Sequence, residues 1–145
     1  MIVRPAGLWI ADGKLLTMRY QYAEKDRFNL PGGNQEPGEE IRLGLIREFR
    51  EELGVDVVVG DLLFTAETLV AEREVLHLLF EIKTLVGSPQ INPQETKALE
   101  LVWLEPEALK TTPMYPAVGS NVEPWIRSRV RDKIYFGRIF QDWIK

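Results

Sequence analysis

The stretch from Gly33 to Val55, GNQEPGEEIRLGLIREFREELGV, decides how the rest of the sequence is interpreted. Its large apolar residues recur every four positions, at Ile41, Leu45, Phe49 and Leu53. This spacing predicts a helix of about four turns over residues 39–53, with one apolar stripe that faces the core. Gly54 is a typical residue to end such a helix, because glycine readily adopts the left-handed conformation of a C-terminal cap.

The glutamates Glu48, Glu51 and Glu52 lie on a second face of this predicted helix. Their spacing places the three carboxylates within one turn, where like charges repel one another. A bound cation would relieve this repulsion. Because only oxygen donors are present, and neither His nor Cys stands nearby, the cluster favours Mg²⁺ or Mn²⁺ over zinc. Mg²⁺ usually completes its coordination with phosphate oxygens of a substrate, so the cluster also indicates phosphate chemistry.

The spacing of the polar residues and glycines in this stretch resembles the signature box of the Nudix hydrolases. Gly33 is followed after five residues by Glu39, and after seven more by Arg47-Glu48, then Glu51-Glu52 and Gly54. All fixed positions of the box are therefore present. The resemblance implies an α/β (α+β) fold, namely an α/β/α sandwich with a mixed β-sheet.

The resemblance also implies roles for individual residues. The metal ligands would be the carboxylates of Glu48, Glu51 and Glu52, with help from a backbone carbonyl of Gly32 or Gly33. Arg47 and Glu39 would orient the box glutamates through ion pairs and shape the preceding loop.

Two positions depart from the usual Nudix pattern. Phe49 stands where Leu or Ile is usual, and Gly44-Leu45 stands where small Ala residues are usual. Gly44 should destabilise the helix by about 1 kcal/mol relative to Ala. Neither position is a predicted metal ligand, so we expect these changes to affect helix packing rather than activity.

The reaction implied by the family is attack of a metal-activated water on one phosphorus of a diphosphate bridge. A carboxylate beside the metal is the natural general base for this water. Within the box the candidates are Glu52 and Glu51. On a downstream loop the candidates are Glu95 and, second to it, Glu100. His77 stands alone in an apolar segment, so we expect it to be structural rather than catalytic.

Three functions remain open from the sequence. The first is hydrolysis of a pyrophosphate bond in a nucleoside diphosphate linked to another moiety. The second is a nucleoside triphosphate pyrophosphohydrolase that sanitises the nucleotide pool, and the third is a non-catalytic nucleotide-binding regulator on the same fold. The intact box glutamates favour the two enzymes. As substrate contacts we single out Arg19 and Arg27 for the phosphates and Phe28, among other aromatic residues, for the base.

Outside the box, strand-like and turn-like segments alternate. Residues 3–10 and 14–20, separated by Asp12-Gly13, predict a β-hairpin, and residues 21–27 predict a loop. Strand-forming residues dominate 55–59, 62–71, 75–86 and 97–104. A short helix is expected at residues 105–110 and a second helix at residues 122–131.

Length and composition limit the remaining possibilities. The 145 residues predict a single domain over 1–145. The formal net charge of −4, from 18 Lys and Arg against 22 Asp and Glu, disfavours a polymeric nucleic-acid partner. The sequence has no Cys and no stretch apolar enough for a membrane span, so we expect a soluble cytoplasmic protein. The aromatic tail, residues 135–143, could complete the core or form the contact of a homodimer.

Overall fold

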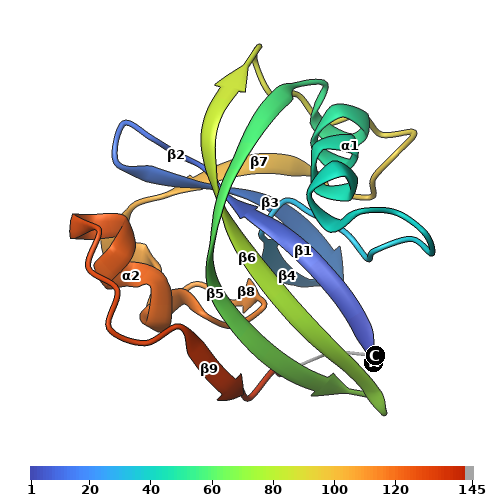
Figure 1. The fold of residues 1–145 in the computed structure, drawn as a ribbon. Coiled ribbons are helices and arrows are strands. Elements are labelled where there is room, and N and C mark those ends of the chain that lie inside the picture. Colours follow the sequence, from blue (N-terminus) through green and yellow to red (C-terminus); the bar gives the residue numbers. More distant parts are fainter. Residues whose placement is uncertain (143–145) are drawn as a thin grey trace.

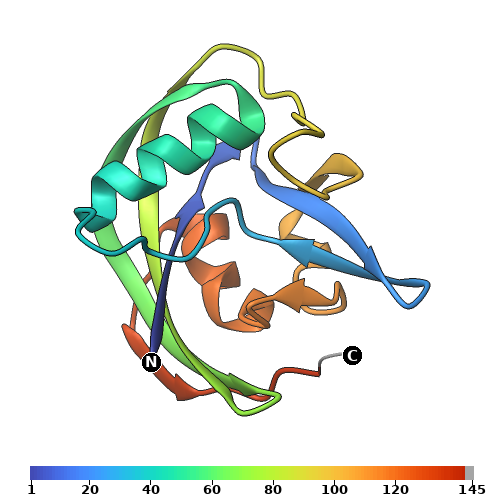
Figure 2. The same cartoon turned by 90° about the vertical axis from the view of Figure 1, so that its right-hand side faces the viewer.

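Two curved β-sheets form the body of the protein, and two α-helices pack against them (Figures 1 and 2). The computed structural model describes residues 1–142. The helices α1 (Ile41–Leu53) and α2 (Gly119–Ser128) lie on opposite sides of the long β5–β6 hairpin in Figure 1, where β5 is Asp56–Val70 and β6 is Arg73–Val86. Each helix contributes to its own cluster of buried apolar side chains. This is the mixed α+β architecture expected from the sequence.

The first sheet has four strands in the order β1 (Ile2–Leu8), β6, β5 and β9 (Tyr135–Arg138). β1 runs parallel to β6, β5 runs antiparallel to β6, and β9 runs parallel to β5. The sheet is therefore mixed, as predicted. The last part of the aromatic tail, including Trp143, lies outside the described residues.

The second sheet has five strands. Its order is β2 (Ile10–Ala11), β3 (Lys14–Tyr22), β4 (Lys25–Asn29) and β8 (Met114–Tyr115), with β7 (Glu100–Leu104) also paired to β3. A 3₁₀ turn, η1 (Pro106–Ala108), follows β7 at the position of the predicted short helix. α2 begins three residues before its predicted start at residue 122. No helix among residues 1–142 is long and apolar enough to cross a membrane.

The predicted hairpin of residues 3–10 and 14–20 is wrong for its first segment. Within residues 1–11, only the two-residue strand β2 pairs with β3, whereas β1 pairs with β6 and is bordered on its other side by residues 31–35. Residues 4–8 are all buried, without the alternation of a strand that has one solvated face. A strand buried in this way is typically covered on both faces, which the local Asp12-Gly13 turn signal could not reveal.

Two other predictions about turns were also wrong. Residues 21–27, predicted as a loop, form a tight hairpin between β3 and β4, with Ala23 and Glu24 at positive φ. Neither residue is the Gly or Asn that usually marks such a turn. Conversely, the predicted break at Gly60-Asp61 is absent, and β5 continues through residues 56–70 with shifts of register.

The helix α1 confirms the prediction made from its apolar spacing. The Glu40 side chain caps its N-terminus by accepting a hydrogen bond from the Leu43 N–H, and Gly54 ends it at φ 66°. Leu45, Phe49 and Leu53 are buried.

Both departures from the Nudix pattern have a packing explanation. A Cβ atom on Gly7 of β1 would lie 2.8 Å from ring carbons of Phe49, so the missing side chain makes room for the larger aromatic ring. A Cβ atom on Gly44 would lie 2.5 Å from Oε1 of Glu39. Gly44 therefore leaves space for a carboxylate that approaches the helix backbone closely.

His77 of β6 is fully buried beside a neighbouring strand. Its Nε2 shares a 2.8 Å hydrogen bond with the Thr68 hydroxyl. Its ring packs against Tyr115 in a T-shaped arrangement, with the two ring centroids 5.2 Å apart. Burial, assisted by the charge of Arg4, lowers the pKa of His77 to about 3. The imidazole is thus neutral in the folded protein at any physiological pH, in agreement with a structural role.

The packing of Gly7 against Phe49 predicts a coupled effect of two substitutions. Gly7→Ala should lower the free energy of unfolding by about 1–3 kcal/mol, because the added methyl group overpacks the core. The same Cβ would lie 2.8 Å from Ile82, so combining the change with Phe49→Leu should remove only part of that penalty. The double variant should still be more stable than the sum of the two single effects. Urea denaturation of the four proteins measures this coupling, and strict additivity would contradict the proposed contact.

The buried neutral His77 predicts a dependence of stability on pH. Below the unfolded-state pKa of 6.5 the unfolded chain gains a proton that folded His77 does not take up until about pH 3, so this residue destabilises the fold as pH falls. Between pH 7 and pH 5 this contribution is about 2 kcal/mol. Urea denaturation of His77→Gln at both pH values should show a loss of stability on acidification that is smaller by this amount. An unchanged pH dependence would show that His77 is not held neutral.

Candidate active site

Arg47 of α1 binds several acidic residues of the box at once. Its Nε and Nη2 donate to the two carboxylate oxygens of Glu39 at 2.7 and 3.1 Å. Its Nη1 donates to Glu51 at 2.9 Å, and Nη2 also donates to Glu48 at 3.2 Å. This pairing lowers the pKa of Glu39 and raises that of Arg47. The ion pairs expected of Arg47 and Glu39 are therefore present.

Glu48 and Glu52 are the carboxylates of the cluster whose negative charge is least offset by neighbouring positive charge. Burial raises the pKa of Glu48, and Arg47 only partly opposes this effect. Burial raises the pKa of Glu52 to about 7, with a further contribution from the negative charge of Glu48. Two neighbouring carboxylates are thus partly withdrawn from water, and burial outweighs the nearby positive charge that acts on them.

The Gly32-Gly33 loop lies directly against this pair of carboxylates. A Cβ atom on Gly33 would overlap the Glu48 carboxylate, so only glycine allows that carboxylate to approach the loop backbone so closely. The Gly33 N–H donates to the Pro5 carbonyl at 3.2 Å, which fixes the loop to β1. The box glycine and its first metal-ligand candidate are therefore in contact.

Glu51 is more exposed than Glu48. Its carboxylate is paired with Arg47, and its side chain is 41% exposed. In this arrangement no three acidic or histidine side chains among residues 1–142 are grouped to hold a metal ion. The all-oxygen donor set and the partly buried Glu48 and Glu52 fit a divalent cation, whereas Glu51 would have to turn away from Arg47 to join them.

The loop before β7 folds back onto the C-terminal end of α1. The Asn92 N–H donates to the Glu52 carbonyl at 2.9 Å, and the Gln90 N–H donates to the Leu53 carbonyl at 3.0 Å. Glu95 on this loop contributes to the raised pKa of Glu52, which places its charge near the cluster. Glu100 is instead paired with Arg19 at 2.9 Å. Of the two downstream candidates, the structure brings Glu95 to the box glutamates.

The three predicted substrate residues have other contacts in this structure. Arg19 is held by Glu100 and by Asp26. Arg27 is buried, and its Nη2 donates to the Asp142 carbonyl at 3.1 Å. Phe28 packs against a hydrophobic cluster. Their roles in substrate binding remain predictions, to which these contacts add no support.

Arg4 of β1 is a site residue that the sequence analysis missed. It is 7% exposed, and its charge lowers the pKa of both Glu48 and Glu52, which places it near the cluster. A single arginine in the otherwise uncharged segment of residues 1–10 was the signal that could have revealed it. Charged side chains are rarely buried without a functional or structural partner.

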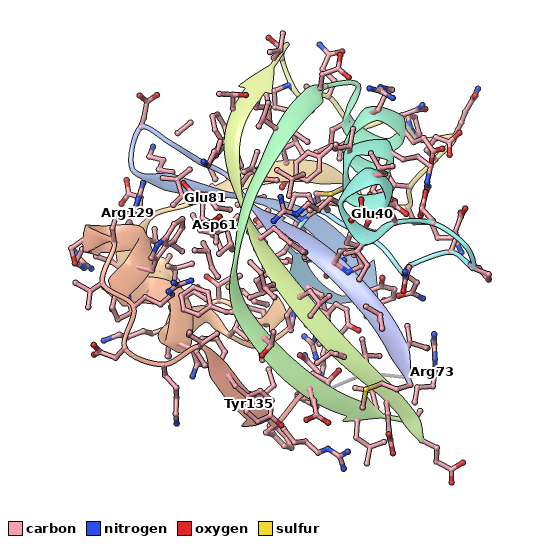
Figure 3. All side chains as sticks on the ribbon, viewed as in Figure 1. Glu40, Asp61, Arg73, Glu81, Arg129 and Tyr135 are labelled. Carbon is pink, nitrogen blue, oxygen red and sulfur yellow. The ribbon has the colours of Figure 1, made fainter. Side chains whose placement is uncertain are left out.

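Arg4 also lines a cavity of about 270 Å³. The other side chains around it include Tyr22, Asn29, Arg73 and Tyr115. Figure 3 shows Arg73 at the start of β6, well below Glu40 at the start of α1. Arg4 therefore connects the acidic cluster of α1 with a neighbouring cavity.

Comparison with known proteins agrees with this geometry. A model of the NUDIX domain matches residues 1–126. The CTP pyrophosphohydrolase of Escherichia coli strain K12 is 33% identical over 121 residues, which cover 81% of this chain and 85% of that protein.

Solved structures show the same fold. The E. coli ORF135 protein superposes with a TM-score of 0.76 at 28% identity, over 90% of this chain and 91% of that one. The MutT protein from Methanosarcina mazei Go1 superposes with a TM-score of 0.74 at 23% identity, over 90% and 96% of the two chains. With a complete box, a matching fold and a NUDIX domain model over most of its length, the chain belongs to the Nudix family.

Proposed function

We propose that the protein is a metal-dependent nucleoside triphosphate pyrophosphohydrolase. The observation that carries the proposal is the contact of the Glu48 carboxylate with Gly33, with Glu52 beside it and Glu95 nearby. Carboxylates gathered at a loop backbone suit a hard cation and the phosphates that it recruits. The E. coli relative named CTP pyrophosphohydrolase supports a triphosphate substrate.

The metal would be held by Glu48 and Glu52, by Glu51 after it turns from Arg47, and by a carbonyl of Gly32 or Gly33. Mg²⁺ or Mn²⁺ bound there would activate a water and neutralise charge on the phosphates. Arg47 holds Glu39, Glu48 and Glu51 in place and thereby limits the orientations open to the ligands.

The proton of the attacking water would pass to a carboxylate at the edge of the cluster. Glu52 is suited because its raised pKa, about 7, lies near the working pH of the reaction. Glu95 is the alternative, because the loop that bears it is fixed to the end of α1. Substitution of each residue separately distinguishes the two assignments.

Hydrolysis of a nucleoside diphosphate linked to another moiety, the first hypothesis from the sequence, is the second candidate. The same carboxylates would serve it, since both substrates contain a pyrophosphate bond. The triphosphate takes precedence because the E. coli relative is named as a CTP pyrophosphohydrolase. The third hypothesis, a non-catalytic regulator, has no support from that pyrophosphohydrolase relative.

Glu52→Gln should abolish most turnover while leaving the fold intact. We expect kcat for a nucleoside triphosphate with Mg²⁺ to fall by about 10³-fold, because the amide neither accepts the proton nor neutralises a cation. Formation of nucleoside monophosphate from a panel of triphosphates, nucleotide sugars and dinucleotides, separated by chromatography, measures this with and without EDTA. Glu105→Gln, at an exposed glutamate beside Lys14, is the matched control and should retain full activity.

Three results would change the assignment. Wild-type activity in the presence of EDTA would contradict metal dependence. Full activity of Glu52→Gln, together with loss of activity in Glu95→Gln, would move the general base to Glu95. Cleavage of only nucleotide sugars or dinucleotides would favour the second candidate function.

Arg47→Lys should weaken the metal site without removing the positive charge. A single ammonium group cannot donate to Glu39 and Glu51 in the fork geometry of arginine. We expect the Mg²⁺ concentration for half-maximal activity to rise by about 10–100-fold. Arg50→Lys on the same helix, which loses only an exposed pair with Asp56, is the control and should leave this concentration unchanged. Equal Mg²⁺ requirements in the two variants would show that Arg47 does not position the ligands.

A further inference from the structure

The loop between β6 and β7 is bonded to the last turn of α1. The final carbonyls of a helix have no partner within the helix itself. In α1, the carbonyls of Glu51, Glu52 and Leu53 all accept hydrogen bonds from this loop. The donors are Gln90 and Asn92. The loop is therefore attached to the same turn of helix that carries two of the candidate metal ligands.

Asn92 makes two of these three bonds, one through its backbone and one through its side chain. Its N–H donates to the Glu52 carbonyl at 2.9 Å, and its Nδ2 donates to the Glu51 carbonyl at 3.3 Å. The position of Asn92 is thus defined relative to the backbone of both glutamates.

The other polar atoms of Asn92 form the turn that carries Glu95. Its side-chain Oδ1 accepts from the Gln94 N–H at 3.1 Å, a local bond that asparagine makes readily. Its own carbonyl accepts from the N–H groups of Glu95 and Thr96 at 3.0 and 3.1 Å. A single residue therefore both shapes the turn and joins it to α1.

A second anchor lies at the other end of this turn. Thr96 is buried, and its hydroxyl shares a 2.7 Å hydrogen bond with the hydroxyl of Tyr20 on β3. Burial raises the pKa of Tyr20, and the charge of Glu52 adds to this effect, which places the anchor near the acidic cluster. Glu95 therefore stands between two fixed residues, Asn92 and Thr96.

The side chain of Asn92 is not needed to end α1. Gly54 already does so in the left-handed conformation, and its N–H donates to the Arg50 carbonyl at 3.0 Å. Asn92 is also exposed, so its side chain adds little to the hydrophobic core. Its bonds fix where the turn lies, and Glu95 is the charged side chain within that turn.

We propose that Asn92 is a positioning residue for the reaction, which holds the Glu95 carboxylate in a fixed place beside Glu52. This assignment rests on the proposed function. It holds for either choice of general base, because Glu95 is either the base itself or a negative charge that acts on Glu52. Groups that are held in place before the substrate arrives accelerate a reaction more than mobile ones.

A double-mutant cycle between Asn92 and Glu95 tests this role. We expect Asn92→Ala to lower kcat for a nucleoside triphosphate with Mg²⁺ by about 10-fold, with little change in KM, because Glu95 is no longer held in place. Glu95→Gln should also lower kcat, and adding Asn92→Ala to it should change kcat by less than about 2-fold. Gln94→Ala, which loses an exposed side chain and keeps its N–H, is the matched control and should retain wild-type kcat.

Amide hydrogen exchange, followed by NMR, tests the anchor without any reaction. In Asn92→Ala the N–H groups of Glu95 and Thr96 should exchange about 10-fold faster or more, because the turn opens more often. The amide of Phe49 in the buried part of α1 should exchange at the wild-type rate. If Asn92→Ala fails to fold by circular dichroism, Tyr20→Phe loosens the other end of the same turn and takes its place in both measurements.

Different results would overturn this role and the proposed function. Wild-type kcat in Asn92→Ala, or unchanged exchange at Glu95 and Thr96, would show that Asn92 does not position Glu95. An equal loss of kcat with and without Glu95→Gln would show that Asn92 acts through another group. If the wild type cleaves nucleotide sugars or dinucleotides and no triphosphate, the proposed substrate is wrong, and the same cycle on the cleaved substrate still decides the role of Asn92. A wild type without hydrolase activity would overturn both.

Discussion

The interaction on which the site depends is the binding of three carboxylates by the single guanidinium of Arg47. A fork of five N–H donors can hold Glu39 bidentately while it also reaches Glu48 and Glu51. Glu39 lies before the helix, whereas the other two lie one turn apart within it. Arg47 therefore fixes both the segment that leads into α1 and the orientation of the acidic side chains on the helix. Without Arg47, these like charges would repel one another.

The close approaches around this network explain two of the glycines. Gly44 leaves room for the Glu39 carboxylate that Arg47 holds, and Gly33 leaves room for the Glu48 carboxylate. Gly44 destabilises the helix by about 1 kcal/mol relative to Ala. A methyl group at this position would displace the Glu39 carboxylate from its ion pair with Arg47. The network does not compensate Glu52, whose pKa remains raised to about 7 by burial and by Glu48. The negative charge of Glu95 adds to this effect.

The sequence predicted α1 and its acidic face well because both follow from local spacing. The period of four from Ile41 to Leu53 and the cap at Gly54 require no knowledge of distant residues. The partners of β1 could not be predicted in this way, because the pairing with β6 joins residues about seventy positions apart. The β3–β4 turn was missed because Ala23 and Glu24 adopt positive φ without the usual turn residues. Arg4 and Asn29 were missed for the same reason as the partners of β1. The two residues meet at one cavity only because of the order of the strands in the fold.

This difference also separates the acidic cluster from the neighbouring cavity. The chemistry depends on residues 33–55, which are close in sequence and are held by one arginine. The neighbouring cavity is lined by single residues of β1 and β4, which belong to different sheets and meet only in the folded protein. Arg4 takes part in both, because it is bonded to Leu30 just before the Gly32-Gly33 loop and acts on the charges of Glu48 and Glu52. Arg4 therefore joins strand β1 to the segment that leads into the loop in contact with Glu48.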